Sequence, residues 1–446
     1  MDEPPPLRRN TAFQLLWIGS ATSDFGTQLT RLAMPLLVLA VTGSPLWAGL
    51  IAGARSAATV LAQMPAGVWV DRWDRRRTLV GGQLVQAGVA ALLAALVVAG
   101  QTLMWTFLVL AVVDGVCTAF IGPARSIAIR GVVPAEQLPT AFAQEEARTH
   151  AAWLAGPPTG GLLYGLGQAV PFVVDAVTLL VSAVCTTVAR VPRRPGPVPP
   201  PAGEPAAGEP VPGDAMPGDA VPGDAVPGDA VPGTPSMGRE LREAFRWFWR
   251  QPGLRDSSGT VMMLNLLGGA TILPLIVLIG ERGGDSVVTG AVLAASGIGG
   301  LAGALLSGRT GALLPPGKLL LAVVGIFGGA VVLETLPFGR WWPMLPFVCI
   351  SLATPALNVV MNAVVTRLVP EEMLGRMEAV LTVVGRAMAP LGPILGGFLA
   401  ATLGGAGALL CIGGALLLTA AGAATSRSLR TFTGERAEAV RPHQRF

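Results

Sequence analysis

The chain is dominated by long apolar stretches that contain no charged residue. Residues 78–113 include no Asp, Glu, Lys or Arg, and neither do residues 387–426. A helix needs about 20 predominantly apolar residues to cross the hydrocarbon core of a bilayer. Only 13% of the chain is charged, whereas a soluble domain carries about 25% charged residues. These features predict an all-α polytopic membrane protein.

The apolar stretches predict twelve transmembrane helices in two pseudo-symmetric halves of six. Their expected positions are 14–40, 45–70, 78–100, 103–128, 146–166, 169–190, 256–280, 286–308, 318–337, 341–366, 376–402 and 404–426. The last two are divided near Gly404. The first apolar run is itself long enough to span a bilayer, so no cleavable signal is expected.

The placement of arginine predicts the orientation of the chain. The basic residues of one side are Arg72, Arg75, Arg76, Arg77, Arg193, Arg194, Arg239, Arg242, Arg246, Arg250, Arg255, Arg367 and Arg376. The alternate turns near residues 41–45, 100–102, 166–170 and 403–405 have none. Because cytoplasmic loops are enriched in Lys and Arg, both termini are expected in the cytoplasm. The basic residues are all Arg except Lys318, which is typical of a GC-rich bacterial genome and places the chain in a bacterial inner membrane.

The centre of the chain separates the two halves. Residues 1–190 form the first bundle, and residues 191–237 form a Pro/Gly-rich linker with Val-Pro-Gly-Asp-Ala repeats. Such a composition cannot bury a core and predicts disorder; the linker is either a docking tether or a spacer, and we favour the spacer. Residues 238–255 predict an amphipathic cytoplasmic helix. Residues 256–426 form the second bundle, and residues 427–446 a cytoplasmic tail.

The two halves resemble each other in sequence. A shift of 236 residues places Val-Pro-Ala-Glu-Gln-Leu at 133–138 on Val-Pro-Glu-Glu-Met-Leu at 369–374. The same shift places Gly-Pro-Pro-Thr-Gly-Gly at 156–161 on Gly-Pro-Ile-Leu-Gly-Gly at 392–397. One offset that matches two motifs indicates a duplicated six-helix unit, an architecture of secondary transporters with a central binding site.

Several motifs resemble those of the major facilitator superfamily. The turn after the second predicted span resembles its signature loop, with Gly67, Asp71, Arg72, Arg75 and Arg76 at the matching positions and Asp74 where a second Gly is usual. The predicted helix five carries Gly156, Pro157, Pro158, Gly160 and Gly161, which resemble the motif of proton-antiport exporters. Phrases near residues 122–125, 134–138, 171–176 and 239–250 resemble the macrolide-efflux and enterobactin-exporter branch.

The resemblance implies roles for both motifs, beside simpler explanations. Asp71 would engage helix ends or an Arg across the interface between the halves and release them on opening inward. The alternative is that Arg72–Arg77 only hold the loop in the cytoplasm, which leaves Asp71 unexplained. The helix-five motif would form a bend that seals an exporter against leak. Ordinary close packing of small residues is the alternative.

Ionisable residues inside the predicted spans are candidates for function, because they are costly in a bilayer. Asp24 and Asp114 are the candidates for proton coupling, and Arg31, Arg55 and Arg125 are the candidate partners that tune their acidity. A static ion pair or a snorkelling end group is the alternative for each. For Asp175 and Glu334 we favour that alternative, and Glu145, Glu146 and Arg148 are expected as gate or surface charges.

The sequence as a whole predicts a proton-coupled secondary transporter that exports a small amphipathic or hydrophobic molecule by alternating access. No phosphate-binding loop, catalytic constellation or metal-ligand cluster is present in the sequence. We therefore expect no enzyme activity, no metal or other cofactor, no nucleotide and no nucleic acid, with the proton gradient as energy source. The expected partners are a small-molecule substrate and the bilayer, and the expected state is a monomer. An uptake transporter, or a receptor or assembly factor on the same fold, remains an alternative.

Overall fold

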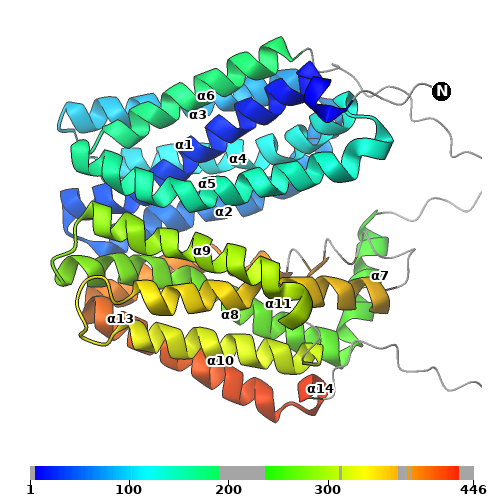
Figure 1. Ribbon diagram of the computed structural model, residues 1–446, viewed down its shortest axis with the longest axis vertical. Helices are drawn as coiled ribbons and strands as arrows, with labels where there is room; N and C mark the ends of the chain where they lie inside the picture. Colours follow the sequence, from blue (N-terminus) through cyan, green and yellow to red (C-terminus); the bar gives the residue numbers. More distant parts are fainter. Residues whose placement is uncertain are drawn as a thin grey trace, which may run out of the picture.

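The computed structural model is all-helical and consists of two helix bundles that pack side by side (Figure 1). It describes residues 6–101, 103–189, 237–310, 314–369, 377, 380–381 and 384–430. The described helices of the first bundle are α1 (Thr11–Thr42), α2 (Pro45–Arg72), α3 (Arg75–Val98), α4 (Met104–Val132), α5 (Leu138–Leu166) and α6 (Val170–Val188). Short 3-10 turns, η1 (Leu7–Arg9) and η2 (Ala135–Gln137), precede α1 and α5.

The second bundle continues the same pattern. Its described helices are α8 (Pro252–Glu281), α9 (Ser286–Thr310), α10 (Pro316–Glu334), α11 (Met344–Leu368), α13 (Leu391–Thr425) and the short α14 (Arg427–Arg430). The amphipathic helix α7 (Met237–Trp249) precedes it. The predicted helix 238–255 is therefore divided, because α8 already begins at Pro252. Phe248 of α7 is buried against Leu254 and Met377, which ties α7 to the bundle.

Ten helices within the described ranges are long and apolar enough to cross a membrane. The fold class predicted from the sequence is confirmed, and three of the twelve predicted spans differ in detail. α5 has the length of a span but is not among the ten. Predicted spans eleven and twelve share one long helical stretch. Residues 376, 378–379 and 382–383 of predicted span eleven lie outside the described residues.

The break between the last two predicted spans lies at Gly404, as the sequence predicts. Gly404 has φ 70° and ψ 179° inside α13, a region that is essentially restricted to glycine. Glu281, the last residue of α8, accepts a hydrogen bond from the backbone N–H of Gly405 (Oε1–N 2.9 Å). This bond satisfies an amide that the break removes from the helical ladder.

Replacement of Gly404 tests this break. We expect Gly404→Ala to destabilise the protein by about 1–3 kcal/mol, the cost of a strained backbone conformation, and to lower the apparent melting temperature in detergent. Gly414→Ala on the same helix is the matched control, because a Cβ there meets nothing within 4 Å and no positive φ is recorded. Equal melting temperatures for the two variants would contradict the assignment of Gly404 as a helix break that requires glycine.

The bundles contact each other through two symmetric helix pairs, α5 with α9 and α2 with α13. A Cβ on Gly161 of α5 would lie 2.2 Å from the carbonyl oxygen of Ser286, at the first turn of α9. A Cβ on Gly397 of α13 would lie 2.6 Å from the carbonyl oxygen of Pro45, at the first turn of α2. Both contacts lie at the end of the bundles opposite the basic turn. Towards that turn, a Cβ on Gly67 would meet nothing within 4 Å.

Candidate functional site

A cavity of about 790 Å³ lies between the two bundles, which is the size of typical small-molecule sites. Its wall is largely apolar and includes Leu93, Phe172, Leu273, Ile276 and Phe347. The charged residues that line it are Arg31, Arg55, Asp114, Asp175 and Arg386. Four of these five were candidates from the sequence, and Arg386 was not.

Asp114 forms an ion pair with Arg55 in the wall of the cavity. Nε of Arg55 lies 2.5 Å from Oδ2 of Asp114, and Gln86 Nε2 donates a hydrogen bond to the other carboxylate oxygen (2.9 Å). α4 approaches α2 closely here, because a Cβ on Gly115 would lie 2.3 Å from the carbonyl oxygen of Arg55. Both charged side chains keep about a quarter of their surface exposed, at 28% and 23%. Water and ligands in the cavity can therefore reach this pair.

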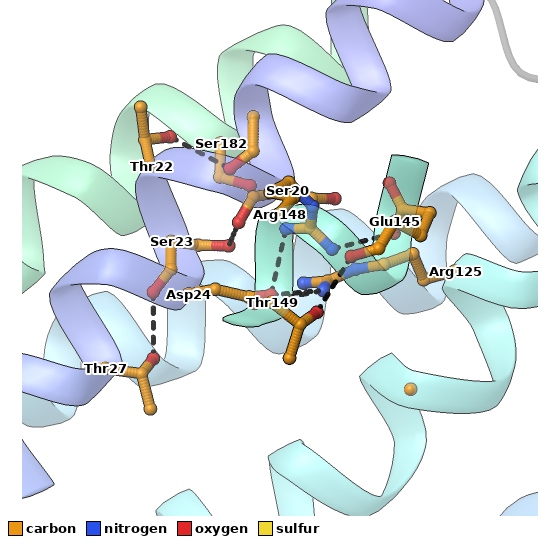
Figure 2. Close-up of polar contacts among 12 residues, drawn as sticks. Ser20, Thr22, Ser23, Asp24, Thr27, Arg125, Glu145, Arg148, Thr149 and Ser182 are labelled. Carbon is orange, nitrogen blue, oxygen red and sulfur yellow. Dashed lines mark hydrogen bonds and ion pairs between the residues drawn. The ribbon is translucent and has the colours of Figure 1, made fainter. Parts of the chain in front are cut away.

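Asp24 lies outside the cavity lining, in a separate charge cluster (Figure 2). It accepts hydrogen bonds from Nη1 of Arg125 (3.0 Å) and from Nη1 of Arg148 (2.8 Å). Arg148 also donates to Oε2 of Glu145 (2.7 Å). The side chain of Arg148 is only 4% exposed. Two carboxylates and two guanidiniums thus join α1, α4 and α5.

The sequence predicted Arg125 beside Asp24 as one of several possible partners, but it assigned Arg148 to the gate or surface charges. The only local signal was the spacing of Glu145 and Arg148, since residues three apart lie on one helix face. Arg31, which shares a helix with Asp24, has no ion pair with it among the described residues. Instead, its guanidinium lies 4.7 Å from the centroid of the Trp153 ring.

The Asp24 cluster is expected to stabilise the first bundle. Hydrogen bonds to charged groups contribute about 1.5–3 kcal/mol each, and removal of Arg148 leaves Asp24 and Glu145 with fewer donors. We expect Arg148→Gln to lower the melting temperature clearly. When Asp24→Asn is added to Arg148→Gln, the further decrease should be smaller than the decrease that Asp24→Asn causes alone, because contacting residues couple. Arg130→Gln, in which an exposed Arg of α4 is changed, is the control. If the decreases in melting temperature of the two single variants added fully in the double variant, the assignment of Asp24 and Arg148 to one coupled cluster would be wrong.

Asp175 and Glu334 are both buried, but only Asp175 lines the cavity. Oδ2 of Asp175 accepts a hydrogen bond from Oγ1 of Thr30 (3.2 Å), and its Oδ1 has no hydrogen-bond partner within the described residues. Neither carboxylate oxygen of Glu334 has one there either. Glu334 ends α10 beside Arg282, which donates to the carbonyl oxygen of Thr335 (2.9 Å).

The basic turn joins α2 to α3, as the sequence predicts. α2 ends at Arg72 and α3 begins at Arg75. Asp74, which replaces the usual glycine, is the N-cap of α3, and its side chain accepts hydrogen bonds from the backbone amides of Arg76 and Arg77. Nη2 of Arg76 donates to the carbonyl oxygen of Thr187 on α6 (2.6 Å).

The proposed role of Asp71 in this turn rests on its side chain, which lies outside the described residues, as does that of Arg72. The latch predicted from the resemblance therefore stays a prediction.

The glycines of the helix-five motif are points of close helix contact. α5 stays helical through Pro157 and Pro158. A Cβ on Gly156 would lie 2.3 Å from the Cβ of Gln28, and one on Gly160 would lie 3.2 Å from the Cα of Leu29, both on α1. Gly161 faces α9 instead, as described above. The motif therefore packs α5 on its own bundle and on the opposite bundle at once.

The comparisons with known proteins agree with this architecture. Residues 16–255 match the family model described as Major Facilitator Superfamily. The chain is 26% identical over 404 residues to the multidrug efflux pump Tap of Mycolicibacterium fortuitum, covering 87% of this chain and 89% of that protein. It is 22% identical over 189 residues to macrolide efflux protein A of Streptococcus pyogenes, covering 41% of this chain. That match spans 45% of the length of the macrolide relative.

Solved structures show the same fold. A bacterial homolog of the human lysosomal transporter Spinster, in an inward-facing and occupied conformation, superimposes with a TM-score of 0.72 at 15% identity, covering 98% of this chain and all of that one (100%). A bacterial homologue of the iron transporter ferroportin, in an inward-facing state, gives a TM-score of 0.66 at 13% identity, covering 95% of this chain and 99% of that one. The matched family model, the helical bundles and the motifs together show that this chain is a multi-pass membrane transporter, not an enzyme, and belongs to the major facilitator superfamily.

Proposed function

We propose that the protein is a proton-coupled exporter of a small amphipathic or hydrophobic molecule of the drug, antibiotic or siderophore-like type. The observation that carries the proposal is the Asp114–Arg55 ion pair in the wall of a largely apolar cavity. An apolar cavity of this size suits drug-like ligands. The similarity to multidrug and macrolide efflux proteins supports export over uptake.

The proposed mechanism uses competition for Asp114. When the carboxylate is charged, Arg55 holds it in the ion pair described above. A proton that arrives from outside neutralises Asp114 and releases Arg55. When the cavity faces the cytoplasm, the proton leaves and the pair forms again. In this proposal the substrate binds while Asp114 is charged and leaves when Asp114 is protonated, so that substrate and proton alternate in one cavity, as antiport requires.

The two bundles would rock against each other to switch access. The close contacts at Gly161 and Gly397 lie at the end opposite the basic turn. If the basic turn is cytoplasmic, as the arginine distribution predicts, this arrangement is sealed on the outside and faces inward. Both termini then lie in the cytoplasm of a bacterial cell. The helix-five motif would form part of the outer seal.

The proposed role of Asp24 differs from that of Asp114. Two guanidiniums hold its carboxylate outside the cavity lining, so protonation there would have to break two ion pairs. Asp114 is therefore the first candidate for coupling, and Asp24 positions α1 against α4 and α5. Asp24 remains the second candidate because 23% of its side chain is exposed.

The test is transport by the purified full-length protein in proteoliposomes with an imposed pH gradient. We expect gradient-dependent movement of an uncharged fluorescent drug analogue in the direction opposite to proton flow. Movement in the same direction as protons would favour the uptake transporter. Specific ligand binding without flux in either direction would favour a receptor or assembly factor on this fold.

A further inference from the structure

The central cavity contains a guanidinium for which the described residues supply no acidic partner. Arg31 lies in the middle of α1, lines the cavity and is exposed to it. None of the ion pairs among the described residues includes Arg31. The nearest polar contact of its side chain is Oε1 of Gln28, at 3.5 Å from Nη1.

The acidic residues nearby are all engaged with other groups. Arg55 holds Asp114, and Arg125 with Arg148 holds Asp24. Asp175 accepts from Thr30, the residue before Arg31. Successive residues on a helix point about 100° apart, so Arg31 faces a different direction from the Thr30–Asp175 contact.

Trp153 of α5 orients the free guanidinium. Its ring centroid lies 4.7 Å from Cζ of Arg31. A guanidinium over an aromatic ring is held by cation–π attraction, and its planar N–H donors match the two oxygens of a carboxylate. The contact therefore places these donors beside an aromatic surface.

A second guanidinium lines the same cavity from the other bundle. Arg386 is exposed, and the described part of the chain shows no ion pair for it. Arginines inside a membrane protein are costly and mark ligand or ion pathways. Among the described residues of its lining, the cavity offers against these two cations one carboxylate, Asp175, that is not paired with a cation. The cavity thus has an excess of positive charge.

We propose that the transported molecule is an amphiphile with an anionic group, and that Arg31 binds this group while the apolar part lies against Trp153 and the apolar wall. The proposal rests on the export function proposed above and names the chemical class of its substrate. Arg386 would reach the same ligand from the second bundle, so that the ligand contacts both bundles. A carboxylate is the simplest such group, and its two oxygens fit the planar donors.

A matched set of fluorescent probes tests the charge preference. Dansylglycine is anionic, dansylamide is neutral and dansylcadaverine is cationic, and all three carry the same fluorophore. Their binding to the full-length protein in nanodiscs can be measured by dansyl emission. We expect dansylglycine to bind at least about tenfold more tightly than dansylamide, which corresponds to about 1.4 kcal/mol.

Variants of Arg31 distinguish the contribution of its charge to ligand binding from the contribution of the rest of the pocket. We expect Arg31→Gln to remove the preference for dansylglycine and to leave dansylamide binding within about threefold of the unmodified protein, or about 0.7 kcal/mol, which also shows that the variant is folded. Arg31→Lys keeps the charge without the planar donors, and we expect an intermediate preference. Arg130→Gln, outside the cavity lining, should change nothing.

Two results overturn the inference: dansylglycine that binds no better than dansylamide or dansylcadaverine, and a preference that survives Arg31→Gln. Failure of the export function looks different. Dansylglycine would then bind with the expected preference and dependence on Arg31, but a pH gradient would not drive its movement in proteoliposomes. That result would support the proposed ligand class and contradict the proposed export function.

Discussion

Asp114→Asn is expected to reduce pH-driven export to the level of protein-free vesicles. The asparagine keeps the size of the side chain and its contact with Gln86, but it cannot hold and release a proton. Arg55 then loses its partner 2.5 Å away and stays unpaired in every state. Coupling requires a group whose charge differs between the two access states, and Asp114 is the acid that best meets this condition in the cavity wall. The readout is substrate flux after a pH jump.

A measurement of ligand binding distinguishes a variant that has lost only proton coupling from a variant whose cavity is damaged. We expect the affinity of Asp114→Asn for an uncharged ligand to change by less than about tenfold, or about 1.4 kcal/mol. Downhill exchange of substrate without a pH gradient should persist. Glu146→Gln is the control, since this acid is 74% exposed and lies outside the cavity lining. Full pH-driven export by both Asp114→Asn and Asp24→Asn would end the coupling hypothesis.

The features that the sequence predicted well are local or repeated ones. The basic turn lies between α2 and α3 because charged residues interrupt two apolar runs, and this signal needs no tertiary information. The break at Gly404 follows in the same way from glycines in a long uncharged run. The 236-residue offset likewise placed two glycine motifs in related positions, and both are contact points in the structure.

Charge pairing could not be predicted in this way. Asp24 meets Arg125 and Arg148 across 101 and 124 residues of chain, whereas the sequence offered Arg31, Arg55 and Arg125 alike as partners. Several arginines were equally available to each acid on sequence grounds. Which one forms the pair depends on helix packing, such as the close approach at Gly115 that brings Arg55 to Asp114. Helix packing also decides that Arg386 and Trp153 line the cavity.

The glycine contacts divide the packing of the helix-five motif between the two bundles. Gly156 and Gly160 fix α5 on α1 within one bundle, whereas Gly161 contacts the opposite bundle at Ser286 and Gly290. The second motif repeats this division, with Gly396 against Ala270 of α8 in its own bundle and Gly397 against α2 in the other. Each motif thus combines a contact within its own bundle with a contact between the bundles, and in the proposed mechanism the second contact separates when the outside opens.

Gly161→Val is therefore expected to abolish export by preventing closure at the outer end. A Cβ at this position would lie 2.2 Å from the carbonyl oxygen of Ser286 and 3.2 Å from the Cα of Gly290. Both obstacles are backbone atoms, so α5 and α9 must separate. Overpacking costs about 1–3 kcal/mol, which shifts a conformational equilibrium about 5- to 150-fold. The population should move towards a state in which the outer end is open.

Chemical labelling can detect this shift directly. In a background without the four native cysteines, Met34→Cys places a thiol in the cavity lining. A membrane-impermeant maleimide added outside the cell should label it several-fold faster in Gly161→Val than in the parent, following the shift of about 5-fold or more. Gly88→Val is the control, because a Cβ there meets nothing within 4 Å. Lost export with unchanged outside labelling would show that the contact of Gly161 with α9 does not close the outer end, and the outer seal would then have to lie elsewhere, with the contact of Gly397 on α2 as the next candidate.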